Sequence, residues 1–311
     1  MVFLLVNIGK ECPSHIADCI KQLLLFDNSV YFIADSFSDQ IKELLNNQHL
    51  KFVEIMSLVK TENHKVFDKL NKLDAEWRDG FWRFAVERFF IIEDFLKQYQ
   101  LKDVLHIEHD NLVYFNADRY QFFFKAITKG IALPADSNVR CIPSLVYIRD
   151  EKAIHDFCLF YNTKCTNKSI TDMKAFSLYL NDKKCDALPV LPEIYTKKKM
   201  FLCSENGHFV FKKHMFSNNQ LQLGGIFDAA AFGQYIGGID PRNDSSDTVG
   251  FINETAVYSP SEFKISWIKQ FGLFAPFISF DGSENIPLLN LHIHSKKLHE
   301  FRSDLLNNGK K

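Results

Sequence analysis

Two carboxylates follow a short apolar segment in the first half of the chain. Residues 104–107 are apolar apart from His106, and Glu108 and Asp110 come directly after them. On an extended strand, alternate side chains lie on one face, so both carboxylates are predicted to point the same way, with His106 behind them. Two such carboxylates repel each other unless a cation lies between them. Oxygen ligands at this spacing suit Mg²⁺ or Mn²⁺ carried by a diphosphate, and the alternative is a solvated strand end.

A second group of side chains with cation and anion chemistry lies near the end of the chain. His292 and His294 are alternate residues of a strand-like segment, so they share a face, and Lys296 follows them. A neutral imidazole can complete a metal shell, and a lysine can neutralise phosphate charge. Exposed histidines, or histidines satisfied in the core, give the same spacing, so the segment alone leaves both interpretations open.

Glycine is concentrated in one stretch of the second half. The chain has 13 glycines, and five of them lie between positions 224 and 238. Pairs such as Gly224-Gly225 permit positive φ and a close approach of the backbone to a ligand. The polar residues that would line such a ligand pocket with Gly225 are Asp228, Gln234, Asp240 and Arg242. The alternative is a small-residue helix packed tightly through residues 229–231, followed by a turn at Asp240-Pro241.

The elements that must position these residues alternate between strand and helix in the first half. Strand-like runs lie at residues 2–7, 30–34, 51–55 and 104–107, and helical spacing at residues 13–25, 39–46 and 81–99. This order predicts the α/β class, with a Rossmann-like, mixed but mostly parallel sheet flanked by helices. Ligands of such sheets bind outside the carboxyl ends of the strands. Asn7, Asp35 and Asp110 all lie at predicted carboxyl ends.

The second half is less regular. The predicted strands and the further elements lie at residues 142–148, 209–211, 261–270 and 287–294, and the predicted helices at residues 171–180 and 224–238. Neither an internal repeat nor a low-complexity linker interrupts the chain. We therefore expect one domain over residues 1–306, followed by a frayed tail at 307–311.

Strand, helix, strand, helix and then an acidic triplet after an apolar strand resemble the GT-A glycosyltransferases, which use nucleotide-diphospho-sugars. In that family a DxD motif, often relaxed to ExD, holds the divalent ion that bridges the phosphates. The matching residues here are Glu108, His109 and Asp110, with glutamate at the first acidic position. His294 and Lys296 resemble the family's late metal-binding histidine and phosphate-binding lysine, and His292 is included as a further metal ligand.

The resemblance also implies roles for residues of the first half. Residues 80–90 resemble the helix before the acidic motif, where a basic residue often faces the nucleotide, so Arg83 and Arg88 are expected phosphate contacts. Asn7 and Asp35 are expected near the base and the ribose. Residues 1–175 would form the nucleotide-sugar half, and residues 176–306 the acceptor half with the C-terminal metal and phosphate segment.

A catalytic base is implied by the same resemblance. Inverting members use a carboxylate at the start of a helix beyond the metal motif, and Asp172 has that position. Its alternative is ordinary capping and dipole chemistry in the first turn of a helix. Asp228 and Asp240 are the next candidates for the base.

The implied activity is the transfer of a sugar from a nucleotide-diphospho-sugar, with a UDP-sugar favoured, in a reaction that requires Mn²⁺ or Mg²⁺. The acceptor would be a hydroxyl of a glycan, of a lipid-linked compound or of a protein, and inversion is favoured over retention. The alternatives are a sugar-nucleotide nucleotidyltransferase and a catalytically inactive module that binds glycans or proteins.

Composition excludes other classes. Lys plus Arg is 37 and Asp plus Glu is 38, for a formal net charge of −1, which disfavours a nucleic-acid partner. The seven cysteines include no CxxC pair, so we expect reduced thiols and a cytoplasmic protein. No apolar run approaches the roughly 18 residues that span a bilayer. The 31 phenylalanines predict a bulky core, and those around the acidic motif are further candidates for the walls of a dry pocket.

Overall fold

A seven-stranded sheet forms the centre of the computed structural model, which describes all residues except 75, 129, 138, 200–212, 241–257 and 307–311. Its strand order is β3-β2-β1-β4-β7-β6-β8. The strands are β1 (Val2–Asn7), β2 (Ser29–Ala34), β3 (Leu50–Glu54), β4 (Val104–Ile107), β6 (Ile131–Pro134), β7 (Leu145–Ile148) and β8 (Asp186–Leu188). Only β7 runs antiparallel to its neighbours, β4 and β6. The predicted mixed, mostly parallel α/β sheet is therefore confirmed.

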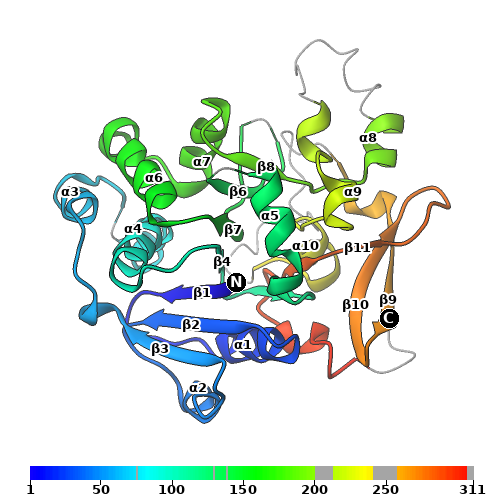
Figure 1. Cartoon of the computed structure of the whole chain (residues 1–311), viewed down its shortest axis with the longest axis horizontal. Helices are drawn as coiled ribbons and strands as arrows, with labels where there is room; N and C mark the ends of the chain where they lie inside the picture. Colours follow the sequence, from blue (N-terminus) through cyan, green and yellow to red (C-terminus); the bar gives the residue numbers. More distant parts are fainter. Residues whose placement is uncertain (75, 129, 138, 200–212, 241–257, 307–311) are drawn as a thin grey trace.

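Helices cover both faces of this sheet (Figure 1). They are α1 (His15–Leu25), α2 (Asp39–Leu44), α3 (Glu62–Leu70), α4 (Phe81–Tyr99), α5 (Gln121–Ile127), α6 (Glu151–Lys164), α7 (Asp172–Asn181), α8 (Glu193–Lys199), α9 (Gln220–Leu223) and α10 (Phe232–Gly237). In β1, Phe3 and Leu5 join the core that includes α1, whereas Leu4 and Val6 join the core that includes α4, α6 and α7. Burial on both faces explains why this strand is a continuous apolar run.

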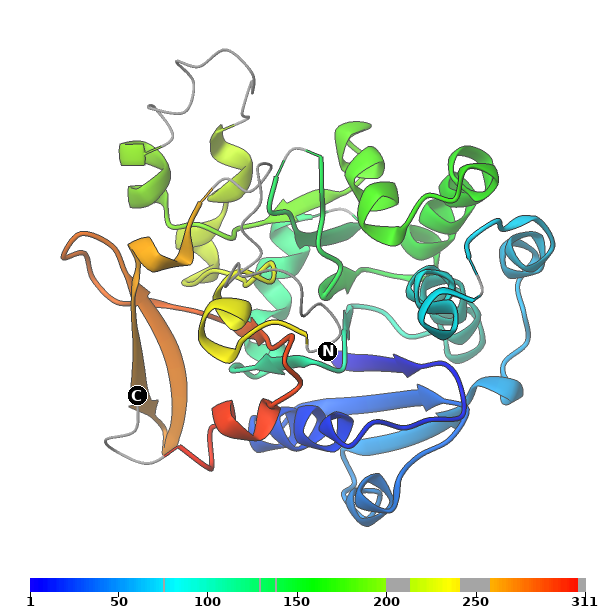
Figure 2. The same cartoon turned by 180° about the vertical axis from the view of Figure 1, so that it is seen from behind.

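Two smaller sheets come from the end of the chain. β9 (Lys264–Gln270), β10 (Leu273–Ser279) and β11 (Ile286–Pro287) form an antiparallel sheet that Figures 1 and 2 show at the opposite side of the molecule from α3. β12 (Asn290–His292) pairs antiparallel with β5 (Asn111–Val113). The second pairing matters for function because β5 directly follows the acidic motif.

The predicted elements of the first half agree with the observed ones to within two residues at each end, and β1, β4 and α4 have the predicted bounds. The strand predicted at 142–148 begins only at Leu145. The helix predicted over 224–238 is wrong, because α10 covers only its last part. Ala230, in the interior of the predicted helix, has a φ of 86°, which a helix does not accommodate. The predicted strand at 209–211 and the tail at 307–311 lie outside the described residues.

Most phenylalanines near the acidic motif are core residues. Phe89, Phe90, Phe95, Phe115 and Phe124 are buried, whereas Phe122 is exposed. Rings of α4, α6 and α7 pack on one another in the core on that side of the sheet which these helices cover. The aromatic surplus therefore mainly builds the core, as its first interpretation predicted.

The cysteines agree with the expected reduced thiols. Every cysteine in the described part of the chain is free, and all of these except Cys12 are buried. Among the described residues, no helix combines the length and the apolar character needed to cross a membrane.

Replacing Phe176 by alanine is expected to destabilise the fold by about 3–5 kcal/mol, because its ring is fully buried. The Phe176 ring stacks on Phe157 with centroids 3.9 Å apart and contacts Phe89 edge-on. The free energy of unfolding in urea measures the effect. Phe122→Ala is the matched control, because this ring is 76% exposed, and its effect should stay within about 0.5 kcal/mol. Equal losses in the two variants would contradict the packing described.

Candidate metal and active site

The acidic motif forms a turn at the carboxyl end of β4. The strand ends at Ile107, and the Asn111 N–H closes a turn on the Glu108 carbonyl at 3.1 Å. The prediction that Glu108 and Asp110 lie on one extended strand is therefore wrong. The turn nevertheless directs both carboxylates at one imidazole. His292 Nε2 lies 3.2 Å from Glu108 Oε2 and 3.1 Å from Asp110 Oδ1.

Backbone pairing brings His292 to this turn. In the β5–β12 ladder His292 is the partner of Asn111, and the Ile293 N–H donates to the Asp110 carbonyl at 2.8 Å. Side chains reinforce the ladder, because Asn290 donates to the Asn111 side chain at 3.0 Å, and Asn111 donates to the Ser144 carbonyl at the same distance. The site thus joins the end of β4 to the C-terminal region.

Asp228 anchors the glycine-rich stretch against the same ladder. Its fully buried carboxylate accepts N–H groups from Ala231, Phe232, Gly233 and His292 at 2.7–3.0 Å. These four donors occupy both oxygens. The structure therefore gives Asp228 a scaffold role, in contrast to the predicted role as a second candidate for the base.

Glycine permits close packing within the chain at two positions of this stretch. A Cβ on Gly233 would lie 2.1 Å from the His292 carbonyl oxygen, so only glycine lets α10 approach β12. A Cβ on Gly225 would lie 2.9 Å from Leu289 Cγ and from the Pro287 carbonyl oxygen. Gly225 is predicted to leave room for a ligand, but the structure fills this space with Leu289 and the Pro287 carbonyl oxygen.

The carboxylates and His292 have the geometry of a cation site. Glu108, Asp110 and His292 each offer a ligand atom, and these atoms lie within 4.8 Å of one another. Burial opposes protonation of His292, but attraction to Asp110 and Glu108 outweighs it and raises its pKa to about 10. Burial also opposes ionisation of the two carboxylates, yet Arg88 at Glu108 and His292 at Asp110 hold their pKa values below the usual range. Without a metal, protonated His292 supplies the positive charge between the two carboxylates.

The donor set fits a divalent metal in place of that proton. His292 Nε2 joins two carboxylate oxygens, and a mixed nitrogen and oxygen set favours a transition-metal ion such as Mn²⁺ over Mg²⁺, which prefers oxygen. The buried Nδ1 of His292 has no hydrogen-bond partner among the described residues. The imidazole is therefore oriented by its backbone and by the carboxylates themselves.

Lys296 and His294 differ in their relation to this group. Lys296 Nζ forms an ion pair with Asp110 Oδ2, so the structure brings this lysine to the carboxylates. His294 hydrogen-bonds the Gln234 side chain, and its ring centroid lies 4.3 Å from that of His292. Burial and the neighbouring His292 lower the His294 pKa to about 3. His292 is thus the histidine that the structure brings to the carboxylates.

Arg88 connects the carboxylate group to Asp172. Its buried guanidinium lies 2.5 Å from Glu108 Oε1 and 2.7 Å from Asp172 Oδ2. Asp172 begins α7 and is itself buried, and its Oδ1 accepts the Met173 N–H at 2.8 Å, so each of its oxygens has one protein donor, compared with two at each oxygen of Asp228. Burial raises the pKa of Asp172 to about 6, although Arg88 opposes the shift. The Arg88 guanidinium therefore links Glu108 of the metal-binding group to Asp172, a carboxyl group that ionises near neutral pH.

The other predicted residues have partners outside this group. Arg83 faces α3, where one of its nitrogens lies 3.8 Å from Asp68 Oδ1, and its Nε lies 3.3 Å from Glu87 on its own helix. Asn7 donates to the Glu11 carbonyl at 2.9 Å, and Asp35 accepts the Gly9 N–H at 2.7 Å, so both support the loop after β1.

Two further residues complete the set of predictions. Asp240 is buried at the end of a described segment. Arg242 lies outside the described residues.

Sequence reasoning did not identify the pairing of His15 with His109. Their ring nitrogens Nε2 and Nδ1 lie 2.9 Å apart, which ties the start of α1 to the acidic turn. Burial lowers the pKa of His109 to about 3. The position of His109 between two acidic residues was the available signal, but its partner lies far away in the chain.

The mixed, mostly parallel sheet defines an α/β protein, in which carboxylates, an imidazole and a lysine form a candidate ligand site at the carboxyl end of a central strand. No protein-family model matches the chain, and no curated protein matches its sequence.

Solved structures that are similar to the chain include glycosyltransferases. Mouse xyloside xylosyltransferase 1 in its apo form has 9% identity and a TM-score of 0.41, over 64% of this chain and 90% of that one. The apo glycosyltransferase GlyE of Streptococcus pneumoniae has 14% identity and a TM-score of 0.38, over 60% of this chain and 45% of that one. A candidate glucose-1-phosphate thymidylyltransferase of Bacillus anthracis has 13% identity and a TM-score of 0.34, over 58% and 83%. The assignment below depends on the residues of the site.

Gly233→Ala is expected to destabilise the fold by about 3 kcal/mol or more, because the added Cβ overlaps the His292 backbone. Displacement of His292 should also reduce any stabilisation by Mn²⁺. Thermal unfolding with and without Mn²⁺ measures both effects. Gly130→Ala is the control, since its Cβ would meet only Ala153 Cβ at 3.6 Å and should change stability by less than about 1 kcal/mol. A Gly233→Ala protein as stable as this control would refute the close approach.

Proposed function

We propose that the protein is a metal-dependent glycosyltransferase of the GT-A type that uses a nucleotide-diphospho-sugar. One observation carries the proposal: Glu108, Asp110 and His292 converge at the carboxyl end of β4, with Lys296 on Asp110. A cation site next to a lysine is suited to a diphosphate, whose charge both can neutralise.

The three converging side chains would hold the metal, with Mn²⁺ favoured by the imidazole. The ion supplies positive charge that stabilises the leaving nucleoside diphosphate. Lys296 is 27% exposed at its side chain, so it can exchange its contact with Asp110 for one with a phosphate oxygen. Arg88 is held between Glu108 and Asp172, so its role is to orient these carboxylates rather than to bind phosphate.

Asp172 is the proposed base of an inverting transfer. The acceptor hydroxyl oxygen bonds to the anomeric carbon while the bond from that carbon to the diphosphate oxygen breaks, and its electron pair leaves with the diphosphate. The hydroxyl proton passes to the Asp172 carboxylate. A pKa of about 6 keeps Asp172 ionised at neutral pH and still basic enough to take the proton.

The remaining assignments concern the two substrates. A UDP-sugar is the favoured donor, with Asn7 and Asp35 near the base and the ribose. Gln234, Asp240 and Arg242 would contact the sugar or an acceptor hydroxyl of a glycan, of a lipid-linked compound or of a protein. Gln234 is connected to the site through its hydrogen bond to His294.

A nucleotide panel tests the proposal. Thermal unfolding with UDP, GDP or CMP, each with and without Mn²⁺, should show metal-dependent stabilisation by one nucleotide, and UDP is the expected one. A ligand at 100 times its Kd stabilises the folded state by about 2.7 kcal/mol. Asp110→Asn should abolish the metal-dependent part because it removes one metal ligand.

The control for this panel is Asp39→Asn, an exposed carboxylate in the first turn of α2. It should respond to nucleotide and Mn²⁺ as the unmodified protein does. Stabilisation that is absent with all three nucleotides, or that survives Asp110→Asn unchanged, rules out the proposed transferase. Hydrolysis of the donor then separates an active enzyme from a binding module.

The pH dependence of turnover tests Asp172. Protonation of a base with a pKa of about 6 should lower kcat tenfold for each pH unit below that value, and the rate should level off above it. Asp172→Asn should lower kcat by about 10²–10⁴-fold and remove this acidic limb. Rate measurements across pH 4.5–8 with the identified donor provide the check, in a range chosen around that pKa.

Asp182→Asn provides the matched control, because Asp182 is an exposed carboxylate at the other end of α7. Its rate and its acidic limb should be unchanged. An acidic limb that persists in Asp172→Asn with undiminished kcat shows that another group is the base, or that the transfer retains configuration and needs none.

A further inference from the structure

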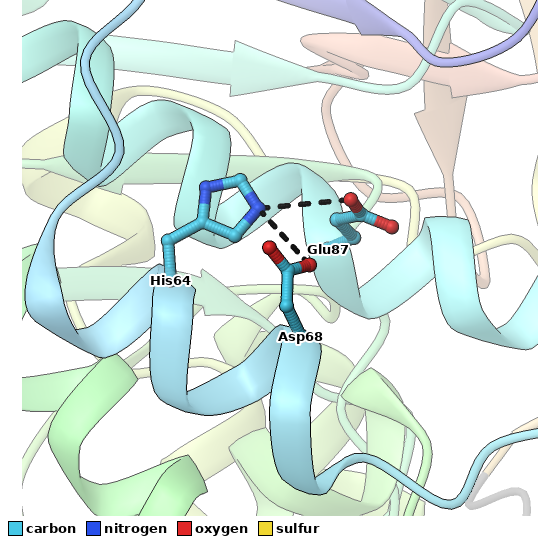
Figure 3. A group of neighbouring side chains, drawn as sticks. All are labelled: His64, Asp68 and Glu87. Carbon is cyan, nitrogen blue, oxygen red and sulfur yellow. Dashed lines mark ion pairs between the residues drawn. The ribbon is translucent and has the colours of Figure 1, made fainter.

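A second group of ionisable side chains lies between α3 and α4. Figure 3 shows Asp68 from α3 and Glu87 from α4 converging on one nitrogen of the His64 ring. His64 Nε2 lies 3.8 Å from Asp68 Oδ1 and 3.6 Å from Glu87 Oε1. The potential ligand atoms of all three residues lie within 4.8 Å of one another. The candidate active site uses none of these residues.

The other ring nitrogen of His64 is already committed. Nδ1 lies 2.5 Å from Asp94 Oδ2, and the other oxygen of Asp94 accepts the Thr61 N–H at 2.6 Å. A carboxylate at this distance requires a hydrogen on Nδ1. The same contact fixes the orientation of the ring, so that Nε2, the other nitrogen, points toward Asp68 and Glu87. A carboxylate that holds the far nitrogen of an imidazole is the usual partner of a metal-binding histidine.

The Nε2 atom is buried and has no hydrogen-bond partner among the described residues. The His64 side chain is only 1% exposed. Burial opposes a proton on His64, but Asp94 and Glu87 outweigh it and raise its pKa to about 9, so a bound metal would replace a proton on Nε2, as at His292. A charged hydrogen bond from that proton to a carboxylate oxygen would have a length of about 2.7–2.9 Å. The observed 3.6 and 3.8 Å are too long for such a bond. They are close to the separation of about 3.3–3.4 Å that two ligands of a tetrahedral ion have when the metal bonds are about 2.0–2.1 Å, so a small inward movement of the carboxylates would let them bind one ion.

Two cations contact the same carboxylates, and their shorter contacts are with the outer oxygens. Lys60 Nζ lies 2.6 Å from Asp68 Oδ2, and Arg83 Nε lies 3.3 Å from Glu87 Oε2, with a second Arg83 nitrogen 3.8 Å from Asp68 Oδ1. The inner oxygens, Oδ1 of Asp68 and Oε1 of Glu87, remain on the side of His64. Each of the three ligands therefore has an outer partner that orients it.

A neighbouring group shows what a satisfied cluster looks like in the same interface. Glu93 accepts hydrogen bonds from Thr61 and Asn63 and lies 2.8 Å from His155 Nδ1. Both of its oxygens are thus occupied by protein donors at ordinary distances. The His64 group differs because its central nitrogen lacks such a contact.

We propose that His64 Nε2, Asp68 and Glu87 bind a second divalent metal ion of the Zn²⁺ type, with water as the fourth ligand. Imidazole nitrogen and carboxylate oxygen are both Zn²⁺ ligands, and zinc sites that retain a water have three protein ligands. The ion would link α3 to α4 at the residue before Arg88, and so support the helix that carries Arg88 into the candidate active site. This inference does not depend on the proposed transferase activity.

Binding of Co²⁺, a spectroscopic substitute for Zn²⁺, tests the proposal in the full-length protein. The probe is the visible absorption of bound Co²⁺, with equilibrium dialysis to count ions. Asp110→Asn removes a ligand of the first site and should leave one Co²⁺ ion bound. In that background, Asp68→Asn and Glu87→Gln should each weaken the remaining binding at least tenfold. Asp94→Asn should weaken it about 10–100-fold through the ring that it orients.

Glu62→Gln in the same background is the matched control, because this α3 side chain is 85% exposed and should leave Co²⁺ binding unchanged. Asp68 is 31% exposed, so Asp68→Asn should fold, which thermal unfolding without metal verifies. An Asp110→Asn protein that binds no Co²⁺, or whose bound Co²⁺ survives both Asp68→Asn and Glu87→Gln, overturns the proposal. Absence of metal-dependent nucleotide binding in the unmodified protein, with Co²⁺ binding intact in Asp110→Asn, would instead reject only the proposed transferase.

Discussion

The antiparallel pairing of β12 with β5 holds His292 beside Asn111, and the candidate active site depends on this contact between distant parts of the chain. Without it, Glu108 and the buried Asp110 would be neighbouring carboxylates with no imidazole between them, an arrangement that repulsion and desolvation disfavour. The pairing is itself supported by buried groups. Asp228 accepts the His292 N–H together with three N–H groups of the glycine-rich stretch, and Gly233 permits the approach of α10.

Helix α4 contributes charged side chains both to the His64 group and to the candidate active site. Its consecutive residues Glu87 and Arg88 point to different neighbours, because successive residues of a helix differ by about 100° in direction. Glu87 faces His64 on α3, and Arg88 reaches Glu108 and Asp172. The rest of the helix buries apolar side chains such as Phe89 and Ile92, which fixes its position. A change in the packing of α3 against α4 would therefore be expected to move Arg88, and with it Glu108 and Asp172.

Patterns within short segments predicted much of the fold. The apolar run of β1 and the long apolar helix α4 were recognisable because strand and helix periodicity are local properties. The prediction of one helix over the glycine-rich stretch is wrong, because the Asp228 carboxylate accepts the backbone N–H groups of Ala231 and Gly233 and so stabilises a loop. Hydrophobic periodicity does not show such a contact. The carboxylates at the end of β4 were identified by type and position, although a turn rather than an extended strand directs them.

The sequence by itself determined the α/β class, the strand that ends in carboxylates and the presence of histidines and a lysine near the C-terminus. Only the tertiary structure decided that His292 meets these carboxylates while His294 contacts Gln234, and that Arg88 enters the site while Arg83 turns to α3. The physical reason is range. Alternation and helical period depend on neighbours along the chain, whereas the partner of a buried charge depends on which backbones pack together after the whole core has formed.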